Sequence, residues 1–102
     1  IVSPDEKKEI TPELIITIVA EHFHLTADDL KSTKRNSEIV APRQIAMYLC
    51  RKLLDATYDD IGQEFGGRDH STVMSSIASV EKKIKTDPLY LKAINEIESR
   101  IK

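Results

Sequence analysis

Residues 58–73, Tyr-Asp-Asp-Ile-Gly-Gln-Glu-Phe-Gly-Gly-Arg-Asp-His-Ser-Thr-Val, contain the signals that decide the fold of this 102-residue chain. Residues 58–65 predict a short helix, and Gly66-Gly67 can adopt the positive φ that commonly ends one. Asp69 is a favoured N-cap, so the next helix should begin at residue 70. Two helices joined by a glycine-containing turn form a helix-turn-helix pattern, although a plain corner in a helical bundle has the same pattern.

Cap signals divide the rest of the chain into further helices. Thr11-Pro12 predicts the start of one helix, and Thr26 with Asp29 predicts a one-turn helix over 27–31. Residues 39–56 predict the longest helix, with Pro42 in its first turn, and Thr86-Asp87-Pro88 separates the last two helices. Three of the predicted helices have apolar residues at helical spacing that are expected to face the core. They are Ile45, Leu49 and Leu53 in the longest helix, Val73, Ile77, Val80 and Ile84 in the helix that begins at residue 70, and Leu91, Ile94, Ile97 and Ile101 in the last helix.

The composition favours one compact all-α domain, because the chain is short, has only three glycines and is 5% aromatic. Cys50 is alone, which excludes an internal disulfide and a cysteine-based zinc cluster and favours a reducing, intracellular compartment. No apolar run of about eighteen residues exists, so no membrane contact is expected. Ser3-Pro4-Asp5-Glu6 resembles a capping box that opens a short polar helix. The first residue, Ile1, suggests a fragment of a longer protein.

The charge is nearly balanced overall but unevenly distributed. The net charge of −2 argues against a polybasic, non-specific nucleic-acid coat. Residues 1–30 nevertheless carry −5 and residues 31–52 carry +5. The predicted exposed loop, residues 31–37, contains Lys34-Arg35, and arginine suits insertion into a narrow A/T-rich minor groove. A solvated basic loop is the plainer interpretation.

The first turn of the second helix in the helix-turn-helix pattern is entirely polar. Asp69, His70, Ser71 and Thr72 can donate or accept hydrogen bonds, and the N-terminal residues of a recognition helix contact base edges in the major groove. Asp69 can accept from the amino group of cytosine. The plainer interpretations are a simple N-cap for Asp69 and a solvated surface side chain for His70.

Two stretches of the chain resemble a known family. Phe65-Gly66-Gly67-Arg68-Asp69-His70-Ser71-Thr72-Val73 and Ala41-Pro42-Arg43-Gln44-Ile45-Ala46-Met47-Tyr48-Leu49 are similar to the C-terminal DNA-binding domain, domain IV, of the DnaA family of bacterial replication initiators. Lys34-Arg35 stands at the expected distance before the second stretch, and Ile61-Gly62 also fits. The resemblance extends over residues 11–102.

The resemblance implies a Trp-repressor-like helical fold, with the helix-turn-helix at about 58–85, that binds double-stranded DNA. The implied site is the DnaA box, a short asymmetric A/T-rich sequence at the replication origin, occupied by a monomer. The implied base contacts are Arg35 in the minor groove and Asp69, His70 and Ser71 in the major groove. The implied phosphate contacts are Lys34, Arg43, Gln44, Arg51, Tyr58, Asp59 and Thr72.

Some positions depart from the family pattern. Tyr58-Asp59 replaces the more common Leu-Pro, which puts that strand contact in question. Ser71 replaces the usual Thr and so lacks a methyl group for thymine, and Ser79 stands where some members have a lysine.

The family's ATPase module is not found in this sequence, because no Gly-x-x-x-x-Gly-Lys-Ser/Thr loop occurs. Residues 1–10 are expected to be the remnant of the helix that links to it. ATP and magnesium are therefore expected only in that module, and no enzyme activity, catalytic residue, metal or cofactor is expected here. The implied location is the bacterial cytoplasm, at the nucleoid.

Two other functions stay open. One is a helical module that binds a protein partner through its acidic first helix, and regulatory protein partners also fit the family. The other is a ligand-controlled helix-turn-helix repressor, which would require a dimer and palindromic half-sites.

Overall fold

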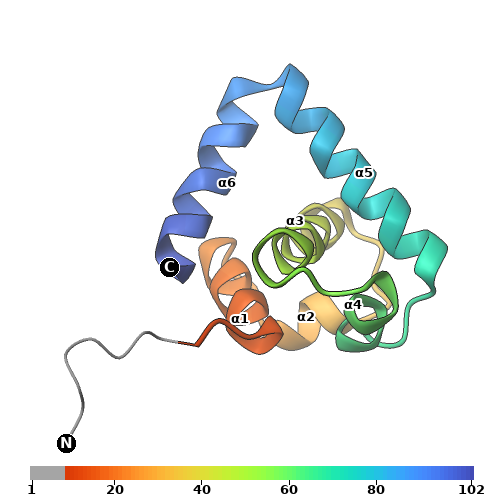
Figure 1. The fold of residues 1–102 in the computed structure, drawn as a ribbon. Helices are drawn as coiled ribbons and strands as arrows, with labels where there is room; N and C mark the ends of the chain where they lie inside the picture. Colours follow the sequence, from red (N-terminus) through yellow and green to blue (C-terminus); the bar gives the residue numbers. More distant parts are fainter. Residues whose placement is uncertain (1–8) are drawn as a thin grey trace, which may run out of the picture.

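The computed structural model describes residues 9–102, so the polar helix predicted to begin at Ser3 lies outside the described part. The predicted all-α fold is confirmed (Figure 1). No helix in the described residues has the length and apolar character needed to cross a membrane. The helices are α1 (Pro12–His22), α2 (Ala27–Lys31), α3 (Ser37–Leu54), α4 (Tyr58–Glu64), α5 (His70–Thr86) and α6 (Pro88–Ile101).

Side-chain caps begin five of these helices at the predicted residues. Thr26 and Asp29 form a reciprocal capping box at α2, with both hydrogen bonds at 3.1 Å. Thr11 caps α1 and Thr57 caps α4 by accepting from a backbone N–H three residues later. The caps satisfy N–H groups that have no partner within the helix, which explains why local sequence predicts these boundaries well. The other two caps are Asp69 of α5 and Asp87 of α6.

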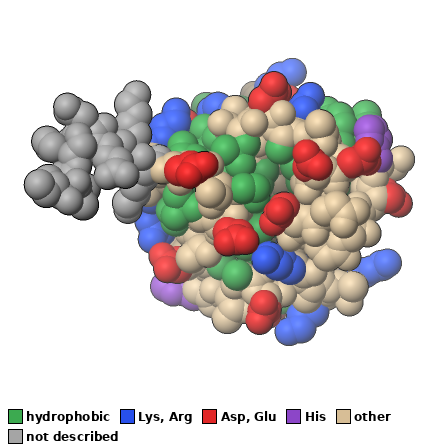
Figure 2. Space-filling model, turned by 60° about the horizontal axis from the view of Figure 1, so that its bottom comes forward, with side chains coloured by type: hydrophobic (Ala, Val, Ile, Leu, Met, Phe, Trp, Pro, Cys, Tyr) green, Lys and Arg blue, Asp and Glu red, His purple; other side chains and the backbone are tan. Residues whose placement is uncertain are grey.

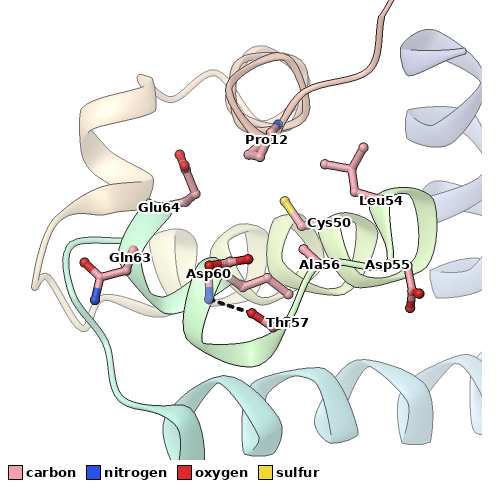
Figure 3. Close-up of a pocket in the computed structure, with 10 residues that line it drawn as sticks. Pro12, Cys50, Leu54, Asp55, Ala56, Thr57, Asp60, Gln63 and Glu64 are labelled. Atoms are coloured by element: carbon pink, nitrogen blue, oxygen red, sulfur yellow. Dashed lines mark hydrogen bonds between the residues drawn. The ribbon is translucent and has the colours of Figure 1, made fainter.

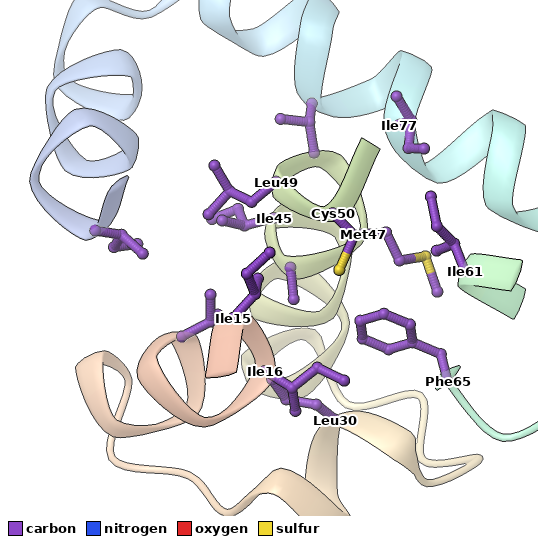
Figure 4. Close-up of a cluster of buried hydrophobic side chains, with 14 of the residues drawn as sticks. Ile15, Ile16, Leu30, Ile45, Met47, Leu49, Cys50, Ile61, Phe65 and Ile77 are labelled. Atoms are coloured by element: carbon purple, nitrogen blue, oxygen red, sulfur yellow. The ribbon is translucent and has the colours of Figure 1, made fainter. Parts of the chain in front are cut away.

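Helix α3 lies at the centre of the fold and packs against α1, α2, α4 and α5, while α6 packs against α1 and α5 (Figure 1). Figure 4 shows the core that these helices enclose, with Ile15 of α1, Leu49 of α3 and Phe65 after α4 pointing into it. All three side chains are 0% exposed. Because each large apolar side chain contributes roughly 1.5–3 kcal/mol when fully buried, this core holds the otherwise marginal short helices in place.

Two details of the predicted helices are wrong. Helix α3 begins at Ser37, so Pro42 lies inside the helix, beyond its first turn. In α6 the inward stripe consists of Tyr90 and the three buried isoleucines Ile94, Ile97 and Ile101, whereas Leu91 is 37% exposed. One residue corresponds to about 100° of helix rotation, which is enough to move Leu91 out of the core.

The turn between α4 and α5 follows the glycine pattern. Gly66 and Gly67 have φ values of 82° and 79°, and the Gly62 carbonyl accepts hydrogen bonds from the N–H groups of Gly67 and Arg68 at 2.9 and 3.0 Å. A Cβ atom on Gly62 would collide with the carbonyl of Arg68. Glycine at position 62 therefore allows the turn to fold back against α4 and sets where α5 begins.

Gly62→Ala is expected to destabilise the domain by about 1–3 kcal/mol, because the collision outweighs the better helix propensity of alanine. Urea unfolding followed by circular dichroism measures this. Gly67→Asn is the matched control, since asparagine tolerates positive φ and no atom lies within 4 Å of the new Cβ. Equal stability of Gly62→Ala and wild type would contradict the proposed close approach.

Candidate nucleic-acid interface

The first turn of α5 is held by its predicted cap. The Asp69 carboxylate accepts from the Thr72 N–H at 2.7 Å. Hydrogen bonds from Thr72, together with the nearby His70, hold the pKa of the Asp69 carboxyl below its usual range. The side chains of Asp69, His70 and Ser71 are nevertheless exposed, so the turn presents polar groups to solvent from a fixed backbone.

A groove of about 560 Å³ runs between the loop formed by residues 32–36 and helix α5. It is lined by Arg35 from the loop, Gln44 from α3, and Thr72 and Ser76 from α5. Thr72 of α5 lies more than twenty residues after Gln44 in the chain, yet the loop, α3 and α5 border one hollow. Arg43 also lines the groove, so the fold brings together four predicted site residues, namely Arg35, Arg43, Gln44 and Thr72.

A second, shallower hollow of about 300 Å³ continues along α5. Gln44, Ser71 and Thr72 line it together with three residues that the sequence analysis did not place in the site, Ser75, Ser76 and Ser79. Positions 72, 75, 76 and 79 share one helix face because they are three or four residues apart. This hydroxyl-bearing stripe could have been found in the sequence from that spacing.

A separate cluster lies beside α5, at the end of α3 and the start of α4. The Arg51 guanidinium lies 4.6 Å from the centre of the Tyr58 ring, and the Tyr58 ring packs edge-on against His70 at 5.2 Å. His70 Nδ1 is 3.6 Å from a carboxylate oxygen of Asp59. Arg51 also donates to the Ala56 carbonyl at 2.8 Å. Four predicted site residues thus form one chain of contacts that supports the His70 side chain.

Arg43 is almost fully buried and donates hydrogen bonds within the protein. Its residue is only 5% exposed, and its Nε and Nη2 atoms donate to the carbonyl groups of Leu30, Ser32 and Lys34 at 2.9, 3.0 and 2.8 Å. The family resemblance implies a phosphate contact for Arg43, whereas in the structure its Nε and Nη2 atoms are bonded to carbonyl groups of the protein. Burial and the charge of Arg68 lower the pKa of Arg43.

Lys34 and Arg68 complete the loop side of the site. The Lys34 side chain is 59% exposed and its Nζ is 3.5 Å from Asp29, so it can reach another anion. Arg68, which the sequence analysis did not assign, donates to the carbonyls of Phe65 and Ser32. Its position in the turn immediately before the Asp69 cap was the only sequence signal for this role.

A further cavity of about 480 Å³ lies between the start of α1, the end of α3 and helix α4. Figure 3 shows the Cys50 sulfur beside it, together with the acidic residues Asp55, Asp60 and Glu64. Burial, with the charge of Glu64, raises the pKa of the Cys50 thiol to about 12, so it is protonated at neutral pH. The acidic lining disfavours phosphate, which separates this cavity from the interface.

Acidic side chains are prominent on one face of the domain (Figure 2). Figure 2 shows one face of the domain, on which acidic side chains gather among apolar ones while Lys and Arg lie mostly toward the edges. A nucleic acid approaching this face would meet repulsion. The arginine-containing loop and α5 are therefore the better candidates for contact with DNA.

Asp69→Ala is expected to lower the melting temperature, whereas Asp69→Asn should stay close to wild type because asparagine is also a good N-cap. The lowered pKa adds a pH test. The ionised cap stabilises the fold at pH values above the ordinary carboxyl pKa, and this contribution is lost as the pH falls through the lowered pKa of Asp69. Thermal unfolding at pH 7 and pH 3 should therefore show a smaller acid-induced loss for Asp69→Asn. Equal melting temperatures for Asp69→Ala and wild type at pH 7 would contradict the capping role.

Comparisons with known proteins agree with this geometry. Residues 12–80 match the family model for the bacterial dnaA protein helix-turn-helix. The chain is 46% identical over 101 residues to the chromosomal replication initiator protein DnaA of Lachnoclostridium phytofermentans, an alignment covering 99% of this chain and 22% of that protein. It is 53% identical over 83 residues to DnaA of Geobacter sulfurreducens, covering 81% of this chain and 19% of that protein.

A solved structure supports the same relationship. The crystal structure of a DNA replication initiation factor superposes with a TM-score of 0.80 at 33% identity, covering 88% of this chain and 27% of the other. The chain spans about a fifth of the length of the curated relatives it matches. The family model covers most of the chain, and it extends through the glycine turn and the α5 stripe described above. The chain therefore belongs to the bacterial DnaA family, and it corresponds to the C-terminal helix-turn-helix domain of that family, domain IV.

Proposed function

We propose that this domain binds double-stranded DNA sequence-specifically at DnaA boxes of a replication origin. Helix α5 lies in the major groove, and the loop formed by residues 32–36 inserts Arg35 into the adjacent minor groove. The observation that carries this proposal is the single groove bordered by Arg35 on one side and Thr72 of α5 on the other. One protein surface can then follow the DNA backbone that separates the two grooves.

The base contacts follow from the exposed first turn of α5. Asp69 accepts from the amino group of a cytosine, His70 contacts a base edge, and Ser71 lies near a thymine methyl. Asp69 is already ordered by its bond to Thr72, so little side-chain freedom is lost when DNA binds.

The phosphate contacts come from residues around these groups. Exposed or half-buried donors at suitable places are Lys34, Gln44, Arg51, Tyr58 and Thr72. Ser75 and Ser79 extend this set along the hollow in α5. Asp59 contributes beside His70 and not at a phosphate, because its exposed carboxylate would repel one.

The proposed role in the whole protein is DNA recognition without catalysis. A single domain contacts one asymmetric site as a monomer, in the cytoplasm at the nucleoid, while regulatory partners act on the intact initiator. Only two of the proposed phosphate donors, Lys34 and Arg51, are cationic, which predicts modest non-specific affinity.

Fluorescence titration of a labelled duplex carrying a DnaA box, against a scrambled duplex of the same composition and at several salt concentrations, tests the function. Tighter binding to the box at every salt concentration is expected. Equal binding to both duplexes would contradict sequence-specific recognition, and no binding to either would contradict the function altogether.

Arg35→Ala is expected to weaken box binding by about 1–3 kcal/mol, because an arginine in a narrow minor groove is strongly attracted by its negative potential. The loss should be largest for boxes with an intact A/T tract. Lys92→Ala, an exposed position on α6, is the control and should bind as wild type does. Unchanged affinity of Arg35→Ala would contradict the minor-groove contact.

His70→Ala is expected to reduce discrimination between box and scrambled duplex more than it reduces binding to the scrambled duplex. The reason is that a base-edge contact contributes only on the correct sequence. The same titrations measure both constants. A uniform loss on the two duplexes would instead mean that His70 contacts the DNA backbone.

A further inference from the structure

Two arginines from distant parts of the chain hold the same carbonyl group. Arg43 Nη2 of α3 donates to the Ser32 carbonyl at 3.0 Å, and Arg68 Nη2 of the α4–α5 turn donates to it at 2.7 Å. A carbonyl oxygen has two lone pairs, so both bonds can form together. We call Arg43, Arg68 and the carbonyl groups they hold the arginine clamp.

The arginine clamp binds the loop at the residues immediately before Arg35. Arg43 Nη2 also donates to the Lys34 carbonyl at 2.8 Å, and this carbonyl belongs to the peptide bond that joins Lys34 to Arg35. On the other side, Arg43 Nε donates to the Leu30 carbonyl at the end of α2. The loop path is therefore fixed at both ends by one guanidinium group.

The turn between α4 and α5 is fixed to the same place by a second contact. A Cβ atom on Gly66 would lie 2.5 Å from the Lys31 carbonyl, so the glycine backbone packs directly against the end of α2. Arg68 also donates to the Phe65 carbonyl within the turn. The loop and the turn are thus joined by close backbone packing as well as by hydrogen bonds.

The two guanidinium groups carry like charges at close range, and burial lowers the pKa of both. Such an arrangement is unfavourable unless carbonyl dipoles compensate for it. The compensation exists only while the loop keeps its observed path. Displacement of the loop would leave the charge of Arg43 without its partners, so the loop is confined to one conformation.

We infer that Arg43 and Arg68 are positioning residues that hold the Arg35 loop in fixed register with the first turn of α5. The inference rests on the proposed function, because it concerns contact with two grooves by one rigid surface. Arg43 then acts through Arg35 and does not contact a phosphate itself. Its planar fork is essential to this role, since a lysine ammonium cannot bond several carbonyls in the same geometry.

Arg43→Lys distinguishes positioning of the loop from a direct phosphate contact. The substitution keeps the positive charge but removes the planar guanidinium group. We expect at least a tenfold loss of box affinity with an unchanged dependence of affinity on salt. Arg68→Lys should behave in the same way. Arg100→Lys, an exposed arginine that pairs with Glu21 away from the loop, is the control and should bind as wild type does. Preserved box affinity in Arg43→Lys would overturn the inference.

A double-mutant cycle tests whether Arg43 acts through Arg35. In wild type, Arg35→Ala should lower box affinity by roughly 5- to 150-fold, which is the expected free-energy loss converted at 1.4 kcal/mol per tenfold. In the Arg43→Lys background it should lower affinity by less than about threefold, because Arg35 is already misplaced. If the double variant lost affinity by the full product of the two single losses, Arg35 and Arg43 would contribute independently, and the inference would be overturned.

The DNA-free protein provides a measurement that does not depend on the proposed function. The backbone order parameter of the Arg35 amide should fall from about 0.85 to below about 0.6 in Arg43→Lys, while values in α3 stay unchanged. An unchanged order parameter would overturn the inference even if DNA binding fails. Failure of wild type to bind the box, with the expected loss of order in Arg43→Lys, would refute the proposed function but not the clamp.

Discussion

The contact between the backbone of α4 at Gly62 and the carbonyl of Arg68 is the constraint on which the site depends. A Cβ atom at position 62 would collide with that carbonyl, so glycine is needed there for the turn to fold back on the helix. The Gly62 carbonyl then accepts two hydrogen bonds from the turn, which places Asp69 at the start of α5. Asp69 in turn orients the polar first turn of α5. The steric requirement at Gly62 therefore helps to determine the direction in which the His70 and Ser71 side chains point.

The sequence predicts those parts of the fold that local chemistry determines. Threonine and aspartate caps, the two glycines of the turn and the apolar spacing of α5 each act within four residues, so a linear pattern is sufficient to find them. The family resemblance added the roles of Arg35 and the α5 residues. The local caps and turns and the family motifs can both be identified without knowing how the helices pack in three dimensions.

The errors concern rotations and long-range partners. Leu91 was expected in the core but is 37% exposed, because adjacent helix positions differ by about 100°. Arg43 is 5% exposed, and the sequence did not reveal its bonds to backbone carbonyl groups. The partners of Arg43 are carbonyl groups 9 to 14 residues earlier in the chain. Carbonyl groups exist at every residue, so no side-chain pattern in the sequence marks the ones that will accept a hydrogen bond.

The hydrogen-bond partners of the arginines help to explain how a chain with a net charge of −2 can be a DNA-binding domain. Four arginines lie between residues 35 and 68, and three of them, Arg43, Arg51 and Arg68, donate to backbone carbonyls of the protein. Their charges still contribute to the local potential, but part of their hydrogen-bonding capacity is used within the protein to build the surface. An interface of this kind gains less from counterion release and more from the placement of a few contacts. Rigid placement therefore matters more for this domain than the number of its positive charges.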